Sequence, residues 1–209
     1  LRDSDDPAII KAAMSHLNLT MIHPFKDGNG RMARALQTLV IARGGTLHPV
    51  FSSIEEWLGE HTKEYYAQLA QTGAGKWSPE RPAQPWIRFC LKAHYQQAAT
   101  LIRRNEEYEQ LYDRITAIAD RHKLPERAHV TLFDAALGFR VTNVRHRAGD
   151  EISELVASRD LRRMCDIGLL LPFGEKRGRF YRASDELLSA RAATRVLKPM
   201  GDPYDMERS

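Results

Sequence analysis

The sequence predicts a mainly α-helical protein that ends in a small region of mixed helix and strand. Two observations lead to this prediction. Apolar residues recur three or four positions apart, the spacing of helices, through most of residues 1–121. Beyond them, three shorter helical patterns precede two apolar and aromatic runs around a glycine-bounded turn, which is typical of a β-hairpin. We therefore expect two domains, residues 1–121 and 122–191, and a flexible tail over residues 192–209.

The first domain is expected to be a bundle of helices. Pro7 favours a helix start, and the apolar pattern continues from there to Ile22. A second helical pattern ends at Gly44, a typical helix C-terminus. Further helices are expected over residues 54–71 and 86–121. The longer one carries apolar residues at coiled-coil-like spacing, which predicts a seam against another helix or in a homodimer, unless it is an interdomain strut. The residues expected to face inward from 54–71 are Ile54, Leu58, Tyr65 and Leu69.

Composition excludes several classes of protein. The chain has 209 residues, of which 43% are hydrophobic and 28% charged, and this is typical of a soluble globular protein. Its two cysteines, Cys90 and Cys165, match no metal-ligand spacing, so neither a disulfide framework nor a zinc site is expected. No apolar run approaches the roughly 20 residues that span a bilayer, and we expect a cytoplasmic protein with no membrane partner. Because the chain begins at Leu1 and not at methionine, we expect that upstream residues have been trimmed.

The most informative segment is residues 23–34, His-Pro-Phe-Lys-Asp-Gly-Asn-Gly-Arg-Met-Ala-Arg. Its glycines allow phosphate to approach the backbone where a helix begins, and unpaired N–H groups at a helix start bind anions. Two arginines three residues apart can reach oxygens of the same polyphosphate. The predicted phosphate-binding residues are Gly28, Asn29, Gly30, Arg31 and Arg34.

The same segment contains a base and a metal ligand. Asp27 is a hard oxygen ligand suited to Mg²⁺, which usually binds one or two carboxylates together with substrate phosphates. A neutral His23 can remove the proton from an attacking hydroxyl group. Phe25 is expected to anchor the loop in the core. Together these groups suffice for displacement at a phosphorus atom.

The segment resembles the signature of the Fic family, His-Pro-Phe, any residue, Asp or Glu, Gly-Asn-Gly-Arg, two residues, Arg, at every specified position. The resemblance covers roughly residues 7–120 and implies a Fic-type helical bundle. Similar proteins mostly use Mg²⁺ and ATP to transfer AMP to a hydroxyl of a target protein. It implies His23 as base, Asp27 as Mg²⁺ ligand, Arg31 on the inner phosphates and Arg34 on the terminal one. Relatives with near-identical motifs move UMP, phosphocholine or phosphate, or remove AMP, so the transferred group stays open.

Two features of the family are not found in this sequence. Family members carry a β-hairpin flap upstream of the motif, and we expect it to be missing because few residues precede His23. Many also carry an inhibitory helix with Ser or Thr, three residues, Glu, then Gly or Asn. Ser52 and Glu56 have that spacing, but Trp57 follows them, so regulation is expected to lie upstream or on a partner. Self-modification is also open, with Tyr65 or Tyr66 as candidate acceptors.

The C-terminal region resembles a winged helix, because helices expected near residues 130–137, 142–147 and 153–167 precede a hairpin with a basic tip. Residues 121–191 contain 14 Lys and Arg against 10 Asp and Glu, whereas residues 1–120 are balanced. DNA binding is one reading and protein docking the other, since Glu154, Asp160 and Asp166 weaken the basic face. The candidate DNA-binding residues are Arg159, Arg162, Arg163, Lys176, Arg177 and Arg179.

Three hypotheses follow. The first is an AMP-transferring enzyme whose C-terminal domain places it near a target, and this is the one we favour. The second is a DNA-binding regulator in which the motif senses nucleotide. The third is a scaffold that only assembles oligomers through residues 86–121, and it leaves Asp27, Arg31 and Arg34 without a task.

Overall fold

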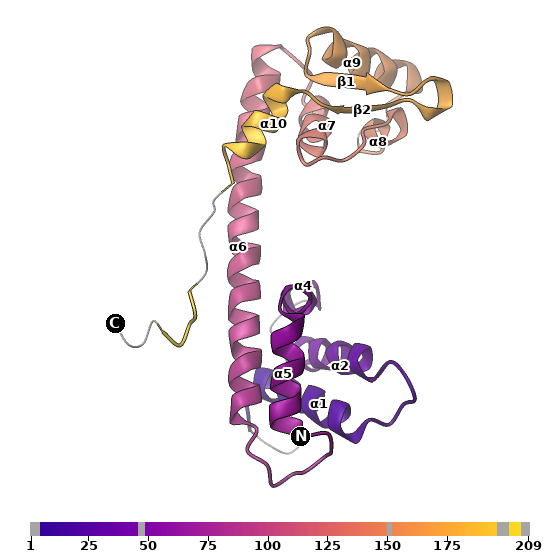
Figure 1. The fold of residues 1–209 in the computed structure, drawn as a ribbon. Helices are drawn as coiled ribbons and strands as arrows, with labels where there is room; N and C mark the ends of the chain where they lie inside the picture. Colours follow the sequence, from indigo (N-terminus) through magenta and orange to yellow (C-terminus); the bar gives the residue numbers. More distant parts are fainter. Residues whose placement is uncertain (1–4, 46–48, 150–151, 196–200, 206–209) are drawn as a thin grey trace. The chain divides into compact units, whose positions relative to one another are not determined.

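The computed structural model describes residues 5–45, 49–149, 152–195 and 201–205. It is mainly helical with one two-stranded hairpin near its C-terminal end, which confirms the predicted fold class (Figure 1). The chain divides into two compact units, residues 1–102 with 199–209 and residues 103–198. The boundary falls inside helix α6 (Gln84–Arg121), and the domain limits expected from the sequence stay predictions. Among the described residues, no helix combines the length and apolarity needed to cross a bilayer.

The N-terminal unit is a set of helices around one apolar core. Within it α1 and α2 pack against each other, so the loop of residues 23–28 between them lies at one end of the pair. The core is centred on Trp86, which is fully buried and donates its indole N–H to the carbonyl oxygen of Ala13 at 2.7 Å. The helices are α1 (Ala8–Ile22), α2 (Asn29–Arg43), α3 (Pro49–Ser52), α4 (Glu55–Glu60), α5 (Thr62–Gly73) and the first part of α6.

The single helix expected over residues 54–71 is two helices, α4 and α5, with a break at His61. The break is stable because side chains satisfy the last carbonyl groups of α4. His61 Nδ1 lies 2.8 Å from the oxygen of Trp57, and the Thr62 hydroxyl donates to the oxygen of Gly59 at 2.8 Å. The inward face was predicted correctly, since Ile54, Leu58, Tyr65 and Leu69 are all buried.

Residues 201–205, which were expected to belong to a loose tail, contact the N-terminal half of α6. Asp202 pairs with Lys92 at 3.0 Å, and the guanidinium of Arg88 lies 4.1 Å from the ring centre of Tyr204. These contacts hold the segment against the N-terminal unit.

The C-terminal unit packs the second part of α6, helices α7 to α10 and a hairpin around its own core. The second part of α6 supplies Leu111, Ile115 and Ile118 to this core. The apolar seam predicted for the long helix therefore packs at these positions against helices of the same chain, while a homodimer stays a prediction. The other elements are α7 (Arg127–Ala136), α8 (Asn143–Arg147), α9 (Glu154–Asp166), β1 (Leu170–Phe173), η1 (Lys176–Gly178), β2 (Phe180–Ala183) and α10 (Asp185–Ala192).

The hairpin pairs β1 with β2 antiparallel, with Phe173 opposite Phe180. Val141, just before α8, adds a single bridge to Tyr181, which ties the hairpin to the helices. The turn needs a glycine at position 174. Its φ is 70°, and a Cβ there would lie 2.6 Å from the carbonyl oxygen of Gly178. The order of three helices and a hairpin agrees with the expected pattern, and the winged-helix assignment stays a prediction.

Candidate active site

His23 closes helix α1. Its backbone adopts the left-handed conformation (φ 51°, ψ 55°), and its N–H donates to the oxygen of Leu19. The exposed ring places Nδ1 3.2 Å from the carbonyl oxygen of Thr20. Because a carbonyl oxygen only accepts, Nδ1 carries the hydrogen in this contact and Nε2 keeps its lone pair. The geometry therefore allows proton acceptance at Nε2, the chemistry expected of His23.

The loop after His23 is held closed by Asn29. The Asn29 side chain is buried, accepts from the backbone N–H of Phe25 at 3.0 Å and donates to its carbonyl oxygen at 2.6 Å. The prediction that Phe25 anchors the loop in the core is wrong, since this ring is 47% exposed. The two backbone bonds from Asn29 provide the anchor in its place, so the ring of Phe25 is left at the surface.

Helix α2 begins with free backbone donors. Gly28 precedes it with φ 87°, no side chain caps the helix, and the first helical bond runs from the N–H of Met32 to the oxygen of Gly28 at 2.9 Å. The N–H groups of Asn29, Gly30 and Arg31 consequently have no acceptor within the helix. Such a start attracts anions through these donors and through the helix dipole.

Asp27 lies at the surface beside this helix start. One carboxylate oxygen accepts from the N–H of Gly28 at 2.6 Å, and the other lies 3.4 Å from a terminal nitrogen of Arg31. The Asp27 side chain is 93% exposed. Across the described residues no three His, Cys, Asp or Glu side chains gather as a metal site. As a single exposed carboxylate, Asp27 is a ligand of the type that Mg²⁺ combines with water and substrate phosphates.

The second motif arginine is held by an ion pair with a distant part of the chain. Arg34 Nε lies 2.6 Å from a carboxylate oxygen of Glu55, the first residue of α4. Tyr65 of α5 also interacts electrostatically with its guanidinium. Burial alone would lower the pKa of Arg34, but Glu55 and Tyr65 outweigh it and raise this pKa, so the guanidinium stays charged.

A directed chain of hydrogen bonds crosses the core from Tyr65. His16 Nδ1–H donates to the Gln37 side-chain oxygen at 2.5 Å, because that oxygen only accepts, and His16 Nε2 therefore accepts from the Tyr65 hydroxyl at 3.0 Å. The Gln37 amide in turn donates to His94 Nε2 at 3.0 Å. This order requires a neutral His16, and burial lowers the pKa of His16 to about 4.

Sequence reasoning missed the ion-pair partner of Arg34, Glu55, and the hydrogen-bond partner of Tyr65, His16. Neither belongs to a motif, and only the inward position of Tyr65 was predicted. Tyr65 is also a poor acceptor for self-modification, because it is 3% exposed and its hydroxyl is bonded, whereas Tyr66 is 61% exposed. The sequence contains no inhibitory motif of the family's pattern, yet a glutamate of this chain, Glu55, forms an ion pair with Arg34.

The six basic residues singled out in the C-terminal region do not form one surface. Arg162, Lys176 and Arg179 line a common groove. Arg163 donates to the carbonyl oxygens of His122 and Lys123 at 3.0 Å, so it closes the end of α6. Arg159 is exposed on α9 and does not line the groove, and the Arg177 side chain lies outside the described residues. Asp160, expected to weaken the basic face, is buried and paired with Arg127.

Comparisons with known proteins agree with the motif. Residues 1–41 match the model of the Fic/DOC family. The chain is 38% identical over 87 residues to protein adenylyltransferase fic-1 of Caenorhabditis briggsae, covering 42% of this chain and 15% of that protein. It is 31% identical over 123 residues to protein adenylyltransferase Fic of Nematostella vectensis, covering 57% of this chain and 26% of that protein.

A solved structure of a Fic family protein from Desulfovibrio desulfuricans G20 superposes on the chain with a TM-score of 0.42 and 18% identity, over 88% of this chain and 51% of the other. This chain spans only a small part of the curated relatives, 15% and 26% of their lengths. Its N-terminal segment nevertheless contains the complete motif, with the loop and helix start that the motif requires. Through this segment, residues 1–41 of the chain are similar to the Fic/DOC family.

Proposed function

We propose that this chain carries the catalytic motif of a protein adenylyltransferase, which transfers AMP from ATP to a hydroxyl side chain of a target protein. The observation that carries the proposal is the pairing of two features within one loop. His23 keeps Nε2 free as a base, and the uncapped start of α2 at Asn29 lies six residues further along the chain. The names of the curated relatives agree with this reaction.

In the proposed reaction the target hydroxyl gives its proton to His23 Nε2 as its oxygen attacks the α-phosphorus. A bond forms from this oxygen to phosphorus, the bond from phosphorus to the bridging oxygen breaks, and pyrophosphate leaves with the electron pair. The N–H groups at the start of α2, with Arg31 and Arg34, bind phosphate oxygens and stabilise the charge that develops on them. Arg34 must exchange Glu55 for phosphate before it can do so.

Mg²⁺ would be held by Asp27 and by the phosphates of ATP, and when bound it neutralises charge on the leaving pyrophosphate. Asp27 is tied to the backbone of Gly28 by one oxygen, so its second oxygen is the one available to a metal once Arg31 moves to phosphate.

The test uses the complete protein with Mg²⁺ and ATP labelled at either the α or the γ phosphate, in host lysate, beside His23→Ala. AMP transfer predicts label on protein from the α position only, and none with the variant. Label from the γ position would instead indicate phosphate transfer. The absence of label from both positions would refute the proposal and favour a regulator that only senses nucleotide.

A further inference from the structure

The C-terminal unit contains a groove of about 900 Å³ that plays no part in the proposed AMP transfer. One wall is α8, a second is α9, and the third is the hairpin with its tip. Its size lies in the range of functional ligand sites, which is roughly 300–1,000 Å³. The lining is mixed, with Asn143, Ser158 and Tyr181 among the charged side chains and with Val144, Cys165 and Pro172 as apolar members.

The groove is strongly cationic. Its walls carry four basic side chains, Arg147, Arg162, Lys176 and Arg179, against one carboxylate, Glu154. Within the part of the chain that the structure describes, none of the four forms an ion pair with a carboxylate. The other arginines nearby are already engaged, since Arg121, Arg127 and Arg145 each pair with an acidic residue.

One of the four cations has a buried donor atom that makes no hydrogen bond within the described part of the chain. Arg147 Nε is buried and has no hydrogen-bond partner among the described residues. A buried guanidinium donor without an acceptor costs free energy of about 1–3 kcal/mol. Because the same guanidinium lines the groove, an anion bound there offsets its positive charge, whereas an apolar ligand does not.

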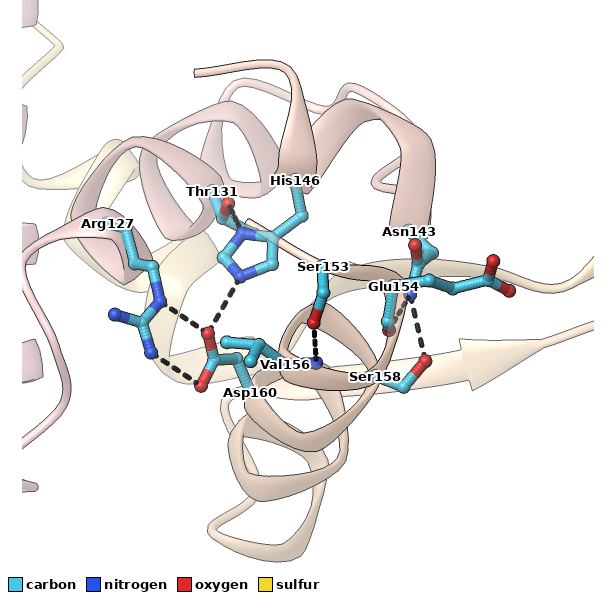
Figure 2. Close-up of polar contacts among 9 residues, drawn as sticks. All are labelled: Arg127, Thr131, Asn143, His146, Ser153, Glu154, Val156, Ser158 and Asp160. Carbon is cyan, nitrogen blue, oxygen red and sulfur yellow. Dashed lines mark hydrogen bonds and ion pairs between the residues drawn. The ribbon is translucent and has the colours of Figure 1, made fainter. Parts of the chain in front are cut away.

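The groove is preformed by a buried polar network beneath it (Figure 2). Asp160 of α9 accepts from Arg127 Nε at 2.6 Å and lies 3.3 Å from His146 Nε2 of α8. The other ring nitrogen of His146 contacts the hydroxyl of Thr131 on α7 at 2.6 Å. Asn143 of α8 also donates to Ser158 of α9 at 2.9 Å. These bonds fix α8 against α9, so a ligand meets a wall geometry that exists before binding.

We infer that this groove binds the phosphate backbone of double-stranded DNA. The four cations come from α8, α9 and the hairpin, so the ligand that satisfies them carries several phosphates. Among the described residues that line the groove, Tyr181 is the one aromatic. Single-stranded nucleic acids bind through stacking on several aromatic rings, so the lining favours a duplex. A helix wall flanked by cations also suits the major groove of DNA, which admits an α-helix, more than the narrow one of RNA.

The lining of the groove changes the set of candidate DNA-binding residues that the sequence predicted. Arg162, Lys176 and Arg179 remain and Arg147 joins them, while Arg159 and Arg163 lie outside the groove. This gives a matched control. Arg159→Gln and Arg162→Gln remove the same charge from the same exposed helix, but only Arg162 lines the groove.

The test measures fluorescence anisotropy of a labelled duplex DNA of about 20 base pairs with the complete protein over a range of salt concentrations. Arg162→Gln and Lys176→Gln are each expected to weaken binding about three- to tenfold and to reduce the slope of log K against log salt by about 1. Arg159→Gln should change neither quantity, and His23→Ala should not matter, so this test is separate from that of AMP transfer.

Three outcomes overturn the inference. They are no binding of duplex DNA, equal effects of Arg159→Gln and Arg162→Gln, and tighter binding of duplex RNA or of a phosphorylated peptide than of DNA. Equal effects would mean that binding follows total charge and does not use the groove. Circular dichroism of each variant confirms that the helices are intact.

Discussion

Replacing Glu55 by glutamine is expected to tighten ATP binding. Glu55 holds Arg34 at 2.6 Å in the structure, and ATP can use this arginine only after the pair separates. The free energy of that separation is subtracted from ATP binding. Glutamine keeps the size of the side chain but removes its charge, so the competing ion pair is lost while α4 is little disturbed.

The magnitude follows from the exposure of the pair. The side chains of Arg34 and Glu55 are 23% and 54% exposed, so solvent screens their attraction. Exposed ion pairs contribute up to about 1 kcal/mol, and a short charge-assisted bond of this kind belongs at the upper end. About 1 kcal/mol corresponds to roughly a fivefold lower Kd for ATP.

The assay is isothermal titration of the protein with ATP and separately with AMP, both with Mg²⁺. If Arg34 holds the terminal phosphate, Glu55→Gln should tighten ATP binding and leave AMP binding unchanged. Glu60→Gln, which removes the same charge from the exposed end of α4, should alter neither. An unchanged Kd for ATP in Glu55→Gln, or an equal gain for AMP, would refute the reasoning that Glu55 competes with phosphate for Arg34.

Three further predictions concern the buried polar contacts. Tyr65→Phe removes the donor to His16 and a hydroxyl that helps to raise the pKa of the motif arginine, so the transfer rate should fall and the nitrogen NMR shifts of the His16 ring should move, at a cost of about 1–2 kcal/mol in stability. Burial lowers the pKa values of His16 and His94 to about 4 in the folded protein. Between about pH 6.5 and pH 4 these two side chains therefore bind protons in the unfolded chain but not in the folded one, which favours unfolding. Thermal melts of the N-terminal unit should therefore show stability that is constant above about pH 6.5 and lost as the pH falls toward 4. Burial alone would raise the pKa of Asp160, but Arg127 and His146 outweigh this effect and lower the pKa. The C-terminal unit should therefore lose stability as the pH falls below the ordinary pKa range of a carboxyl group. Asp160→Asn should remove that acid dependence and cost about 3 kcal/mol in denaturant unfolding.

The sequence was enough to predict those parts of the candidate active site whose contacts join residues close together in the chain. The bonds from Asp27 to Gly28 and from Asn29 to Phe25 join residues one and four positions apart. Residue spacing therefore predicted the loop and the helix start, whereas the role of His23 as a base stays a prediction. Glu55 and Arg34 are 21 positions apart, and Tyr65 and His16 are 49 apart. Helical periodicity predicts which face of a helix is buried, but it does not say which residue of another helix meets that face.

The same limit explains why charge counting misjudged the C-terminal unit. Asp160 was expected to offset the basic face of α9, and Arg163 to contribute to it. In the structure Asp160 is neutralised from beneath by Arg127, and Arg163 is bound to backbone carbonyl groups. An acidic residue that is paired inside the core no longer reduces the potential at the surface, so cations that lack partners decide the charge of the groove. The groove is for this reason more cationic than the composition of residues 121–191 indicates, and Arg147, which no spacing singled out, becomes one of its four cations.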